Sequence, residues 1–314
     1  MLIPNWNGAR WLMGCLDSAL AQTRRPAEVL VVDNGSTDGS ATQAEARCGV
    51  RVLCLGANLG FAAAVNRGIA AVPPSIDAVA LVNPDVLLAP AWLERTMAVL
   101  EGDSDVASVA CKMTDMADPG LLYDTGDLLR RDGGCEQRGR FSVDDGRYDR
   151  PGRVFSACAG AALYRRAALE QVGGFEERFF LYLEDVELGL RLRLAGWDCR
   201  YEPVAARHVG ESSDVVPVRS VAGWAERNTL LLVARYFPVR WLPRVGYRQL
   251  AWAWYALRGG RLRAHLRAAA AALPLIPSML RERSAVRRAA RVPIAAAIPA
   301  QPLRGFAADR MGQQ

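Results

Sequence analysis

The stretch Val29-Leu-Val-Val-Asp33-Asn-Gly-Ser-Thr-Asp-Gly39 joins a continuous apolar run to a polar turn. An unbroken run predicts a strand that is buried on both faces, as in a parallel sheet, because a strand with one wet face would alternate. The turn offers Ser36 or Thr37 as a helix N-cap, and we expect a helix near residues 38–47. The stretch therefore predicts one strand–helix unit of an α/β fold.

The same strand–helix rhythm extends over residues 1–112. Further buried strands are expected at 52–55, 79–82 and 106–110, and helices near 11–22, 61–71 and 90–100, where Pro90 fits the first helical position. The opening strand at residues 2–3 is short, so either the sheet begins with a stub or the chain starts upstream of Met1. The pattern predicts a mainly parallel central sheet flanked by helices.

The rhythm breaks at residues 113–153, which are rich in Gly, Asp and Arg and predict a long excursion over the edge of the sheet. Structure is expected to resume with an apolar run at 154–164, helices near 166–172 and 184–195, and a short strand at 199–202. Gly196 is placed to end the second of these helices.

Composition places the chain among globular proteins. Its 314 residues are 51% hydrophobic and 23% charged, which excludes disordered and fibrous classes and suggests one large domain with an appendage. No stretch reaches the roughly 18–20 uninterrupted apolar residues of a spanning helix, and no secretory signal is visible. The 7 cysteines are scattered without a Cys-x-x-Cys pair, which indicates reduced thiols in a cytosolic protein.

Charge divides the chain into two parts. Residues 1–218 carry 22 basic and 30 acidic side chains, whereas residues 219–314 carry 17 basic and 3 acidic ones. We expect a main domain at 1–218, an amphipathic basic helical region at 219–284 and a loose tail at 285–314. The basic region interleaves tryptophans with arginines, which is typical of helices in a membrane interface that are attracted by anionic lipid. Nucleic-acid binding, or a helical face packed on the main domain, is the alternative.

Polar clusters follow the expected strands, and open parallel sheets bind ligands outside the carboxyl ends of their strands. Asp33 could accept hydrogen bonds from a nucleobase or a ribose, and the helix N-terminus beyond it suits anionic groups. In a second cluster, Gly60 permits close backbone approach and Asn66 lies on the helix that follows. An ordinary strand-to-helix turn and a solvated asparagine are the alternatives for these two clusters.

A third cluster, Asn83-Pro84-Asp85, ends the strand expected at 79–82. A carboxylate at the mouth of a buried strand suits a hard divalent cation held against substrate phosphates, although the cluster is equally compatible with a turn. His208, one of only 2 histidines, follows the short strand at 199–202. It is a candidate metal ligand as neutral imidazole, or else a structural residue.

The tract from Phe179 to Glu187 places Glu184 and Asp185 where an aromatic run meets a helix start. A carboxylate that is partly desolvated by aromatic rings is a candidate general base. A helix N-terminus also favours acids through its dipole, but that alternative gives no reason for the aromatic residues. Glu187 and Arg191, four residues apart, are interpreted as a pair on the helix surface.

Taken in order, these motifs resemble the inverting family 2 glycosyltransferases of the GT-A fold. The resemblance covers about residues 2–240 and is greatest for bacterial rhamnosyltransferase-type enzymes that build surface polysaccharides. It rests on the ordered set Val-Val-Asp33-Asn-Gly-Ser, Asn58-Leu-Gly-Phe, Val-Asn83-Pro-Asp85 and Gly-Gly-Phe175 through Leu-Glu184-Asp185-Val-Glu-Leu to Arg191.

The resemblance implies roles for individual residues. Asp185 would be the catalytic base, with Glu184 beside it, and Asp85 and His208 would hold manganese or magnesium. The metal motif departs from the Asp-x-Asp form of the family, because Asn83 replaces its first carboxylate. Residues 1–112 would form the nucleotide-sugar half of a catalytic domain, and residues 113–218 the acceptor half. The donor nucleotide would contact Pro4, Asn5, Asn7, Asp33, Asn34, Ser36, Asn58, Gly60, Asn66 and Asn83.

The implied reaction is a single displacement with inversion. The expected hexosyltransferase would move L-rhamnose from dTDP-rhamnose to a lipid-linked glycan at the inner face of the cytoplasmic membrane. A UDP-sugar donor and a non-catalytic nucleotide-sugar-binding scaffold are the alternatives. A dinucleotide-dependent oxidoreductase is disfavoured because no Gly-x-Gly-x-x-Gly follows an early strand. No nucleic-acid partner is expected, since no recognised nucleic-acid module accompanies the basic charge.

Overall fold

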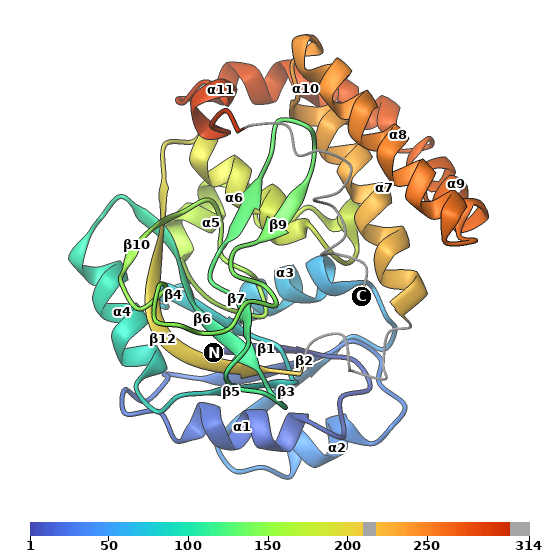
Figure 1. Ribbon diagram of the computed structural model, residues 1–314. Coiled ribbons are helices and arrows are strands. Elements are labelled where there is room, and N and C mark those ends of the chain that lie inside the picture. Colours follow the sequence, from blue (N-terminus) through green and yellow to red (C-terminus); the bar gives the residue numbers. More distant parts are fainter. Residues whose placement is uncertain (210–217, 302–314) are drawn as a thin grey trace. The chain divides into compact units, whose positions relative to one another are not determined.

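The computed structural model describes residues 1–209 and 218–301 (Figure 1). The chain divides into two compact units, one formed by Met1–Leu128 with Glu136–Val218 and the other by Leu129–Cys135 with Arg219–Gln314. The division near residue 218 coincides with the change from an acidic to a basic sequence.

The strands belong to one large sheet and one small one. The strands of the large sheet are β1 (Leu2–Asn5), β2 (Val29–Asp33), β3 (Val50–Cys54), β4 (Ala78–Val82), β5 (Val86–Leu88), β6 (Val106–Asp115), β7 (Leu122–Asp124), β10 (Gly152–Val154), β11 (Ala161–Arg165) and β12 (Asp198–His208). The small sheet pairs β8 (Asp127–Leu129) with β9 (Cys135–Gln137).

Neighbouring strands along the main path of the large sheet run mostly parallel, as the sequence predicts. Its strand order is β10-β12-β6-β11-β4-β1-β2-β3. β1 pairs in parallel with β2 and β4, β2 pairs in parallel with β3, and β6 does so with β12. β11 lies antiparallel between β4 and β6, and the short strands β5 and β7 add antiparallel pairs to β12 and β6.

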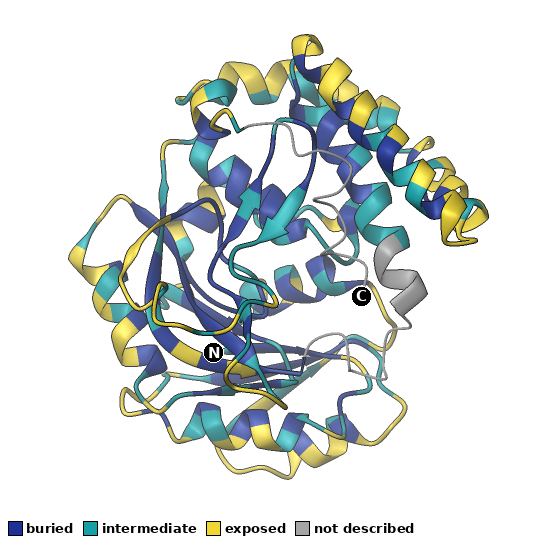
Figure 2. Cartoon of the chain, in the orientation of Figure 1, coloured by how far each residue is buried: buried dark blue, intermediate teal, exposed yellow. Residues whose placement is uncertain are grey.

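Helices cover both faces of this sheet, and each face has its own core. Neighbouring residues of a strand point to opposite faces, so Ile3 belongs to one core and Leu2 to the other. The first core includes residues of α1 (Leu12–Leu20) and α4 (Trp92–Gly102), together with Ala44 of α2 (Ser40–Glu45). The second includes residues of α3 (Phe61–Ala71), α5 (Arg166–Val172) and α6 (Glu184–Leu194). Figure 2 shows the buried strands between helices whose outer faces are exposed.

Several predicted bounds need correction. β3 is half-exposed, because it is the edge strand of the sheet. α4 begins at Trp92, so Pro90 lies before the helix. β12 extends to His208, well beyond the predicted residue 202, and the predicted excursion contains the strands β7 to β10. The helices α3 and α5 have the predicted bounds, and Gly196 follows α6 with a positive φ of 97°.

The second unit is helical. Its helices are α7 (Val218–Tyr236), α8 (Leu242–Arg258), α9 (Leu262–Ala272), α10 (Ile276–Ala289) and α11 (Ile294–Ala297). Arg131 donates from Nε to the carbonyl of Ile298 at 2.8 Å, and its guanidinium lies over the Trp241 ring. The expectation of a loose tail is therefore wrong for residues 285–301, and residues 302–314 lie outside the described part.

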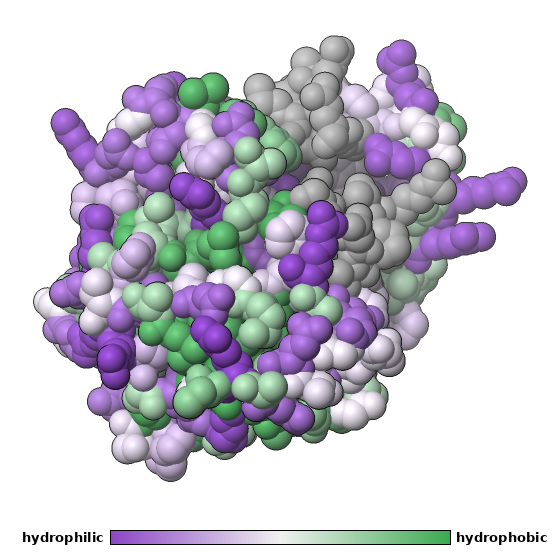
Figure 3. Space-filling model, turned by 90° about the horizontal axis from the view of Figure 1, so that it is seen from below, coloured by the Kyte–Doolittle hydropathy of each residue, from purple (hydrophilic) through white to green (hydrophobic). Residues whose placement is uncertain are grey.

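One face of the molecule is drawn as a space-filling view in Figure 3. On the face seen in Figure 3, hydrophilic side chains are interspersed among hydrophobic ones, as is usual for a globular protein. Within residues 1–209 and 218–301, the helices are too short or too polar to span a lipid bilayer.

Candidate functional site

The predicted nucleotide-binding residues of β1 and β2 come together where the two strands end. Asn5 and Asp33 are partners in the parallel register, and Asn5 Nδ2 donates to Asp33 Oδ1 at 3.0 Å. The other carboxylate oxygen of Asp33 accepts from the backbone N–H of Ser36 at 3.0 Å. Asn7 Oδ1 accepts from the N–H of Thr37 at 2.8 Å. These bonds fix the turn after β2, which we call the Asp33 turn (residues 33–37), and Pro4 lies in the strand that supports it.

A second group of predicted residues joins the Asp33 turn to the start of α3. Asn34 Nδ2 donates to Asn58 Oδ1 at 3.1 Å and to the carbonyl of Gly60 at 3.2 Å. Gly60 has a φ of +89°, and a Cβ there would lie 2.4 Å from the Phe180 ring. Phe180 O also accepts from the N–H of Phe61 at 2.7 Å. Glycine is therefore required at position 60, where the start of α3 meets the segment that leads to Asp185.

Asn66 lies apart from these residues. Its Nδ2 donates to the carbonyl of Phe175 and its Oδ1 accepts from the N–H of Phe175, both at 2.8 Å. Nδ2 also donates to Glu177 Oε1 at 3.1 Å. The side chain thus ties α3 to the segment before α6, and a direct contact with the donor nucleotide stays a prediction.

Asp85 and His208, the predicted metal ligands, face each other across two antiparallel strands. Asp85 directly precedes β5, and His208 is the last residue of β12, which pairs with β5. Asp85 Oδ1 lies 3.2 Å from His208 Nε2. Within the described residues, the buried atoms Asn83 Oδ1 and His208 Nδ1 have no hydrogen-bond partner, and no group of three or more His, Cys, Asp or Glu side chains forms a metal cage.

Tyr123 completes the surroundings of His208 and was not predicted from the sequence. Its ring meets the imidazole edge to face, with 4.4 Å between centroids. The guanidinium of Arg140 lies over the Tyr123 ring, 4.6 Å from its centroid. Both residues come from the excursion at 113–153, which therefore contributes to the site.

Asp185 is held by two backbone donors at the start of α6. Its Oδ2 accepts from the N–H of Ala159 at 3.0 Å, and its Oδ1 accepts from the N–H of Val186 at 2.8 Å. Burial raises the pKa of the Asp185 carboxyl above its ordinary value. The next residue of the loop, Gly160, accepts through its carbonyl from the N–H of Asn83 at 2.8 Å. One short loop therefore connects the candidate base to the metal motif.

Three further carboxylates surround Asp185, and two of them were not predicted. Glu184 is buried, and burial together with the charge of Asp185 raises its pKa well above the ordinary value. Asp124 ends β7, and burial raises its pKa to about 7. Asp127 begins β8 and accepts from the hydroxyl of Ser156 at 3.0 Å. Burial and the charges of Asp124 and Asp185 raise its pKa well above the ordinary value. β7 and β8 each have 3 residues, too few to show a period in the sequence.

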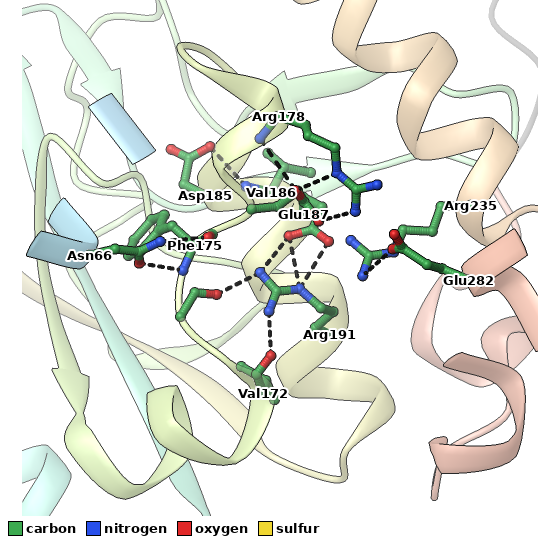
Figure 4. A network of polar contacts seen from close by, with 12 residues as sticks. Asn66, Val172, Phe175, Arg178, Asp185, Val186, Glu187, Arg191, Arg235 and Glu282 are labelled. Atoms are coloured by element: carbon green, nitrogen blue, oxygen red, sulfur yellow. Dashed lines mark hydrogen bonds and ion pairs between the residues drawn. The ribbon is translucent and has the colours of Figure 1, made fainter. Parts of the chain in front are cut away.

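Glu187 and Arg191 form a buried ion pair, and the prediction of a surface pair is wrong. Figure 4 shows the pair and its surroundings. Glu187 is 0% exposed, and Arg191 Nη2 lies 2.7 Å from its Oε2. Arg191 also donates to the carbonyls of Val172 and Gly174, at 2.6 and 2.7 Å. The pair therefore fastens α6 to the turn that Asn66 holds from the other side.

The segment between this turn and Asp185 has an unusual backbone. Phe180, Tyr182 and Leu183 have φ values of 61°, 68° and 65°. Residues other than glycine rarely adopt a positive φ. Such strain persists only when the surrounding structure over-determines it. Phe180 is packed on Gly60, and the segment is flanked by the Asn66 and Arg191 contacts, so Asp185 is presented from a constrained loop.

Comparison with known proteins places the chain in a family. The model of "Glycosyl transferase family 2" matches residues 1–173. An N-acetylglucosaminyl-diphospho-decaprenol L-rhamnosyltransferase of Mycobacterium tuberculosis is 33% identical over 261 residues, which cover 73% of this chain and 83% of the relative. The O-antigen biosynthesis protein RfbC of Myxococcus xanthus is 28% identical over 205 residues, 62% of this chain and 16% of that protein.

Solved structures show the same fold. The mannosyltransferase PcManGT from Pyrobaculum calidifontis, in complex with GDP-Man and Mn2+, matches with a TM-score of 0.54 and 18% identity over 91% of this chain and 79% of that chain. GalNAc-T7 with UDP, GalNAc and Mn2+ matches with a TM-score of 0.59 and 14% identity over 75% of this chain and 47% of that one. The chain therefore belongs to glycosyl transferase family 2 and is a glycosyltransferase with the GT-A fold.

Proposed function

We propose that this glycosyltransferase moves L-rhamnose from dTDP-rhamnose to a lipid-linked glycan in bacterial surface polysaccharide synthesis. The sugar and the acceptor class are supported by the relative that is 33% identical and whose name specifies L-rhamnosyl transfer to a decaprenol-linked N-acetylglucosamine. The observation that carries the catalytic part is Asp185, a half-buried carboxylate held by two backbone N–H donors amid other acids.

Asp185 acts as the general base of a single displacement. It accepts the proton of an acceptor hydroxyl as that oxygen bonds to the anomeric carbon. The bond from that carbon to the diphosphate oxygen breaks on the opposite face, so the configuration inverts and dTDP leaves. Burial raises the pKa of Asp185, which makes the carboxylate a better proton acceptor than an exposed aspartate. The N–H groups of Ala159 and Val186 fix its orientation before the acceptor arrives.

Asp85 and His208 fit a divalent cation, manganese or magnesium. The carboxylate and the imidazole converge to 3.2 Å, and their oxygen and nitrogen atoms suit such an ion. Two protein ligands are enough where substrate phosphates supply others, as is usual for magnesium bound to nucleotides. The ion would stabilise negative charge on the leaving diphosphate. Two solved structures of the same fold, PcManGT and GalNAc-T7, contain Mn2+, which supports the same assignment.

The Asp33 turn is the proposed binding region for the nucleotide base and ribose. Its carboxylate already accepts two internal hydrogen bonds, so it has lone pairs left for a base N–H without a change of conformation. Thymine and uracil offer the same N–H in this position, so a UDP-sugar is the second candidate donor. The oxidoreductase and the non-catalytic scaffold are set aside, because the chain belongs to glycosyl transferase family 2 and a scaffold has no need of a fixed base at Asp185.

The lipid-linked acceptor implies work at a membrane. We place the protein at the inner face of the cytoplasmic membrane as a peripheral protein, because its proposed donor is a nucleotide sugar and its proposed acceptor carries a lipid. The strongly basic second unit supports this location, since the cytoplasmic leaflet is negatively charged.

Calorimetric titration with dTDP, UDP, GDP and NAD, each with and without manganese, tests the proposal. Manganese-dependent binding of dTDP, followed by transfer from dTDP-rhamnose to a polyprenyl-diphosphate N-acetylglucosamine, is the expected result. Preference for UDP would keep the reaction and replace the donor. Binding of dTDP without transfer to any acceptor would leave the scaffold, and binding of NAD alone would overturn the donor class.

A further inference from the structure

Helix α8 carries a row of exposed apolar side chains. Tyr247, Leu250, Trp254 and Leu257 are 39%, 70%, 51% and 53% exposed. At 3.6 residues per turn, the four lie within about 80° of the helix circumference. The opposite side of α8 contributes the buried residues Val245, Arg248, Ala251 and Ala256. We call the four exposed residues the α8 stripe.

The α8 stripe is larger than scattered surface residues would explain. Isolated exposed hydrophobic side chains are normal, whereas a contiguous row along three turns indicates an interaction surface. Within this arc, α8 has no acidic or amide side chain that would interrupt the row, because the remaining position in the arc, residue 243, is proline. The next helix, α9, packs on α8 and adds exposed Leu266, followed by exposed Leu273.

The charge around the α8 stripe is positive throughout. No acidic residue occurs between Glu226 and Glu282, a stretch that includes all of α8 and α9. Exposed arginines flank the stripe, and the guanidinium of Arg258 lies over the Trp254 ring. An apolar helix face bordered by arginines, with a tryptophan at its middle, is the pattern of helices that lie in the headgroup region of a bilayer.

We propose that the α8 stripe docks on an anionic lipid bilayer, with its apolar side chains among the acyl chains and the flanking arginines at the phosphates. The inference rests on the proposed membrane location of the transferase, and it names the surface and the lipid chemistry. The positive charge around the α8 stripe disfavours a second copy of the chain as its partner. In such a dimer the same helix would face itself and bring like charges together. Anionic lipid instead offers the complementary charge.

Sedimentation of the full chain with lipid vesicles tests the proposal. The protein should sediment with phosphatidylcholine vesicles that contain phosphatidylglycerol at low salt, and much less with pure phosphatidylcholine. The double variant Leu250→Ser/Trp254→Ser should lower the vesicle partition coefficient by on the order of tenfold or more. Arg244→Gln/Arg258→Gln should lower it by about fivefold per arginine at low salt, with a smaller effect at high salt.

The double variant Phe141→Ser/Val143→Ser is the matched control, because it removes two exposed hydrophobic side chains of the first unit, 53% and 65% exposed. It should sediment like the unmodified protein. An unchanged affinity for dTDP shows that the first unit of each variant is folded. Equal sedimentation of the α8 and control variants would overturn the proposal. So would a dimer, seen by light scattering without lipid, that becomes a monomer in the α8 variant.

Transfer to a water-soluble acceptor without vesicles separates docking from catalysis. The α8 variant should keep this activity, because its substitutions lie on the second unit and outside the catalytic residues. Transfer without any vesicle binding would reject docking and leave the proposed function intact. Vesicle binding without transfer from any nucleotide sugar would reject the proposed function and leave the docking surface.

Discussion

Oδ1 of Asp85 lies 3.2 Å from Nε2 of His208, although the two residues are far apart in the chain. The antiparallel pairing of β5 with β12 brings them together, with Val86 opposite His208 in the register. The backbone hydrogen bonds between β5 and β12 therefore set the distance between the aspartate and the histidine. This arrangement is the basis of the prediction on metal dependence.

Asp85→Ala should remove most of the manganese-dependent part of dTDP affinity. We expect a loss of at least about tenfold with manganese present, since even residues one layer outside a metal site change metal affinity by 10–100-fold. Affinity without manganese should change little. Calorimetry with and without the ion measures both. Asp145→Asn, at an exposed aspartate paired with Arg147, is the control. Undiminished affinity of the Asp85 variant in manganese would show that the ion binds elsewhere.

Asp185→Asn should stop sugar transfer and leave donor binding almost intact. An amide of the same shape keeps one acceptor for the backbone N–H donors but cannot take the acceptor proton, and loss of a general base typically costs 10²–10⁴-fold. The rate of dTDP release in the presence of acceptor measures sugar transfer, and the affinity for dTDP measures donor binding. A variant that also fails to bind dTDP would point to a structural role for Asp185.

The stability of the protein should fall as the pH rises from about 4 to about 7, in part because of Asp124. Burial raises the pKa of this carboxyl from 3.8 to about 7, so the folded state binds its proton more tightly than the unfolded state. The resulting stabilisation is complete below the unfolded pKa and is lost as the pH rises through the folded one. In Asp124→Asn the free energy of unfolding should therefore fall less over this range. Urea titrations of both proteins across the range measure the difference, and parallel pH profiles would contradict the assignment.

Helices α3 and α5 were predicted to the residue, whereas β12 was predicted at less than half its length. The bounds of these helices follow from local signals. The apolar periodicity lies within each helix, and a glycine lies next to it, Gly60 before α3 and Gly173 after α5. β12 contains Pro203, which lacks a backbone N–H, and its register shifts between Glu202 and Ala205. A proline indicates the end of a strand in the sequence, and only the pairing with β5 and β6 shows that the strand continues.

The candidate site shows the same division. Asp33 and Asp85 were found because each follows an apolar strand, and Asp185 because an aromatic run precedes it. Asp124 and Asp127 lie in strands of 3 residues, and their burial comes from pairing and packing that no local pattern encodes. The sequence does not distinguish a buried Glu187 from a surface one, because four-residue spacing to an arginine occurs equally in exposed and buried pairs.

Glu187→Gln should destabilise the protein much more than Glu170→Gln, although both remove the carboxylate partner of an arginine four residues away. Arg191 and Glu187 are 12% and 0% exposed, so the substitution leaves a buried guanidinium without its counter-charge, which typically costs about 3–5 kcal/mol. Arg166 is 12% exposed like Arg191, but the carboxylate of Glu170 is 60% exposed, so water solvates this ion pair and its loss typically costs less than about 1 kcal/mol. Urea unfolding gives both free energies with the same chemistry and spacing, so that burial is the main difference. Equal losses would mean that the carbonyls of Val172 and Gly174, which accept from Arg191 in either case, hold α6 to the turn without help from Glu187.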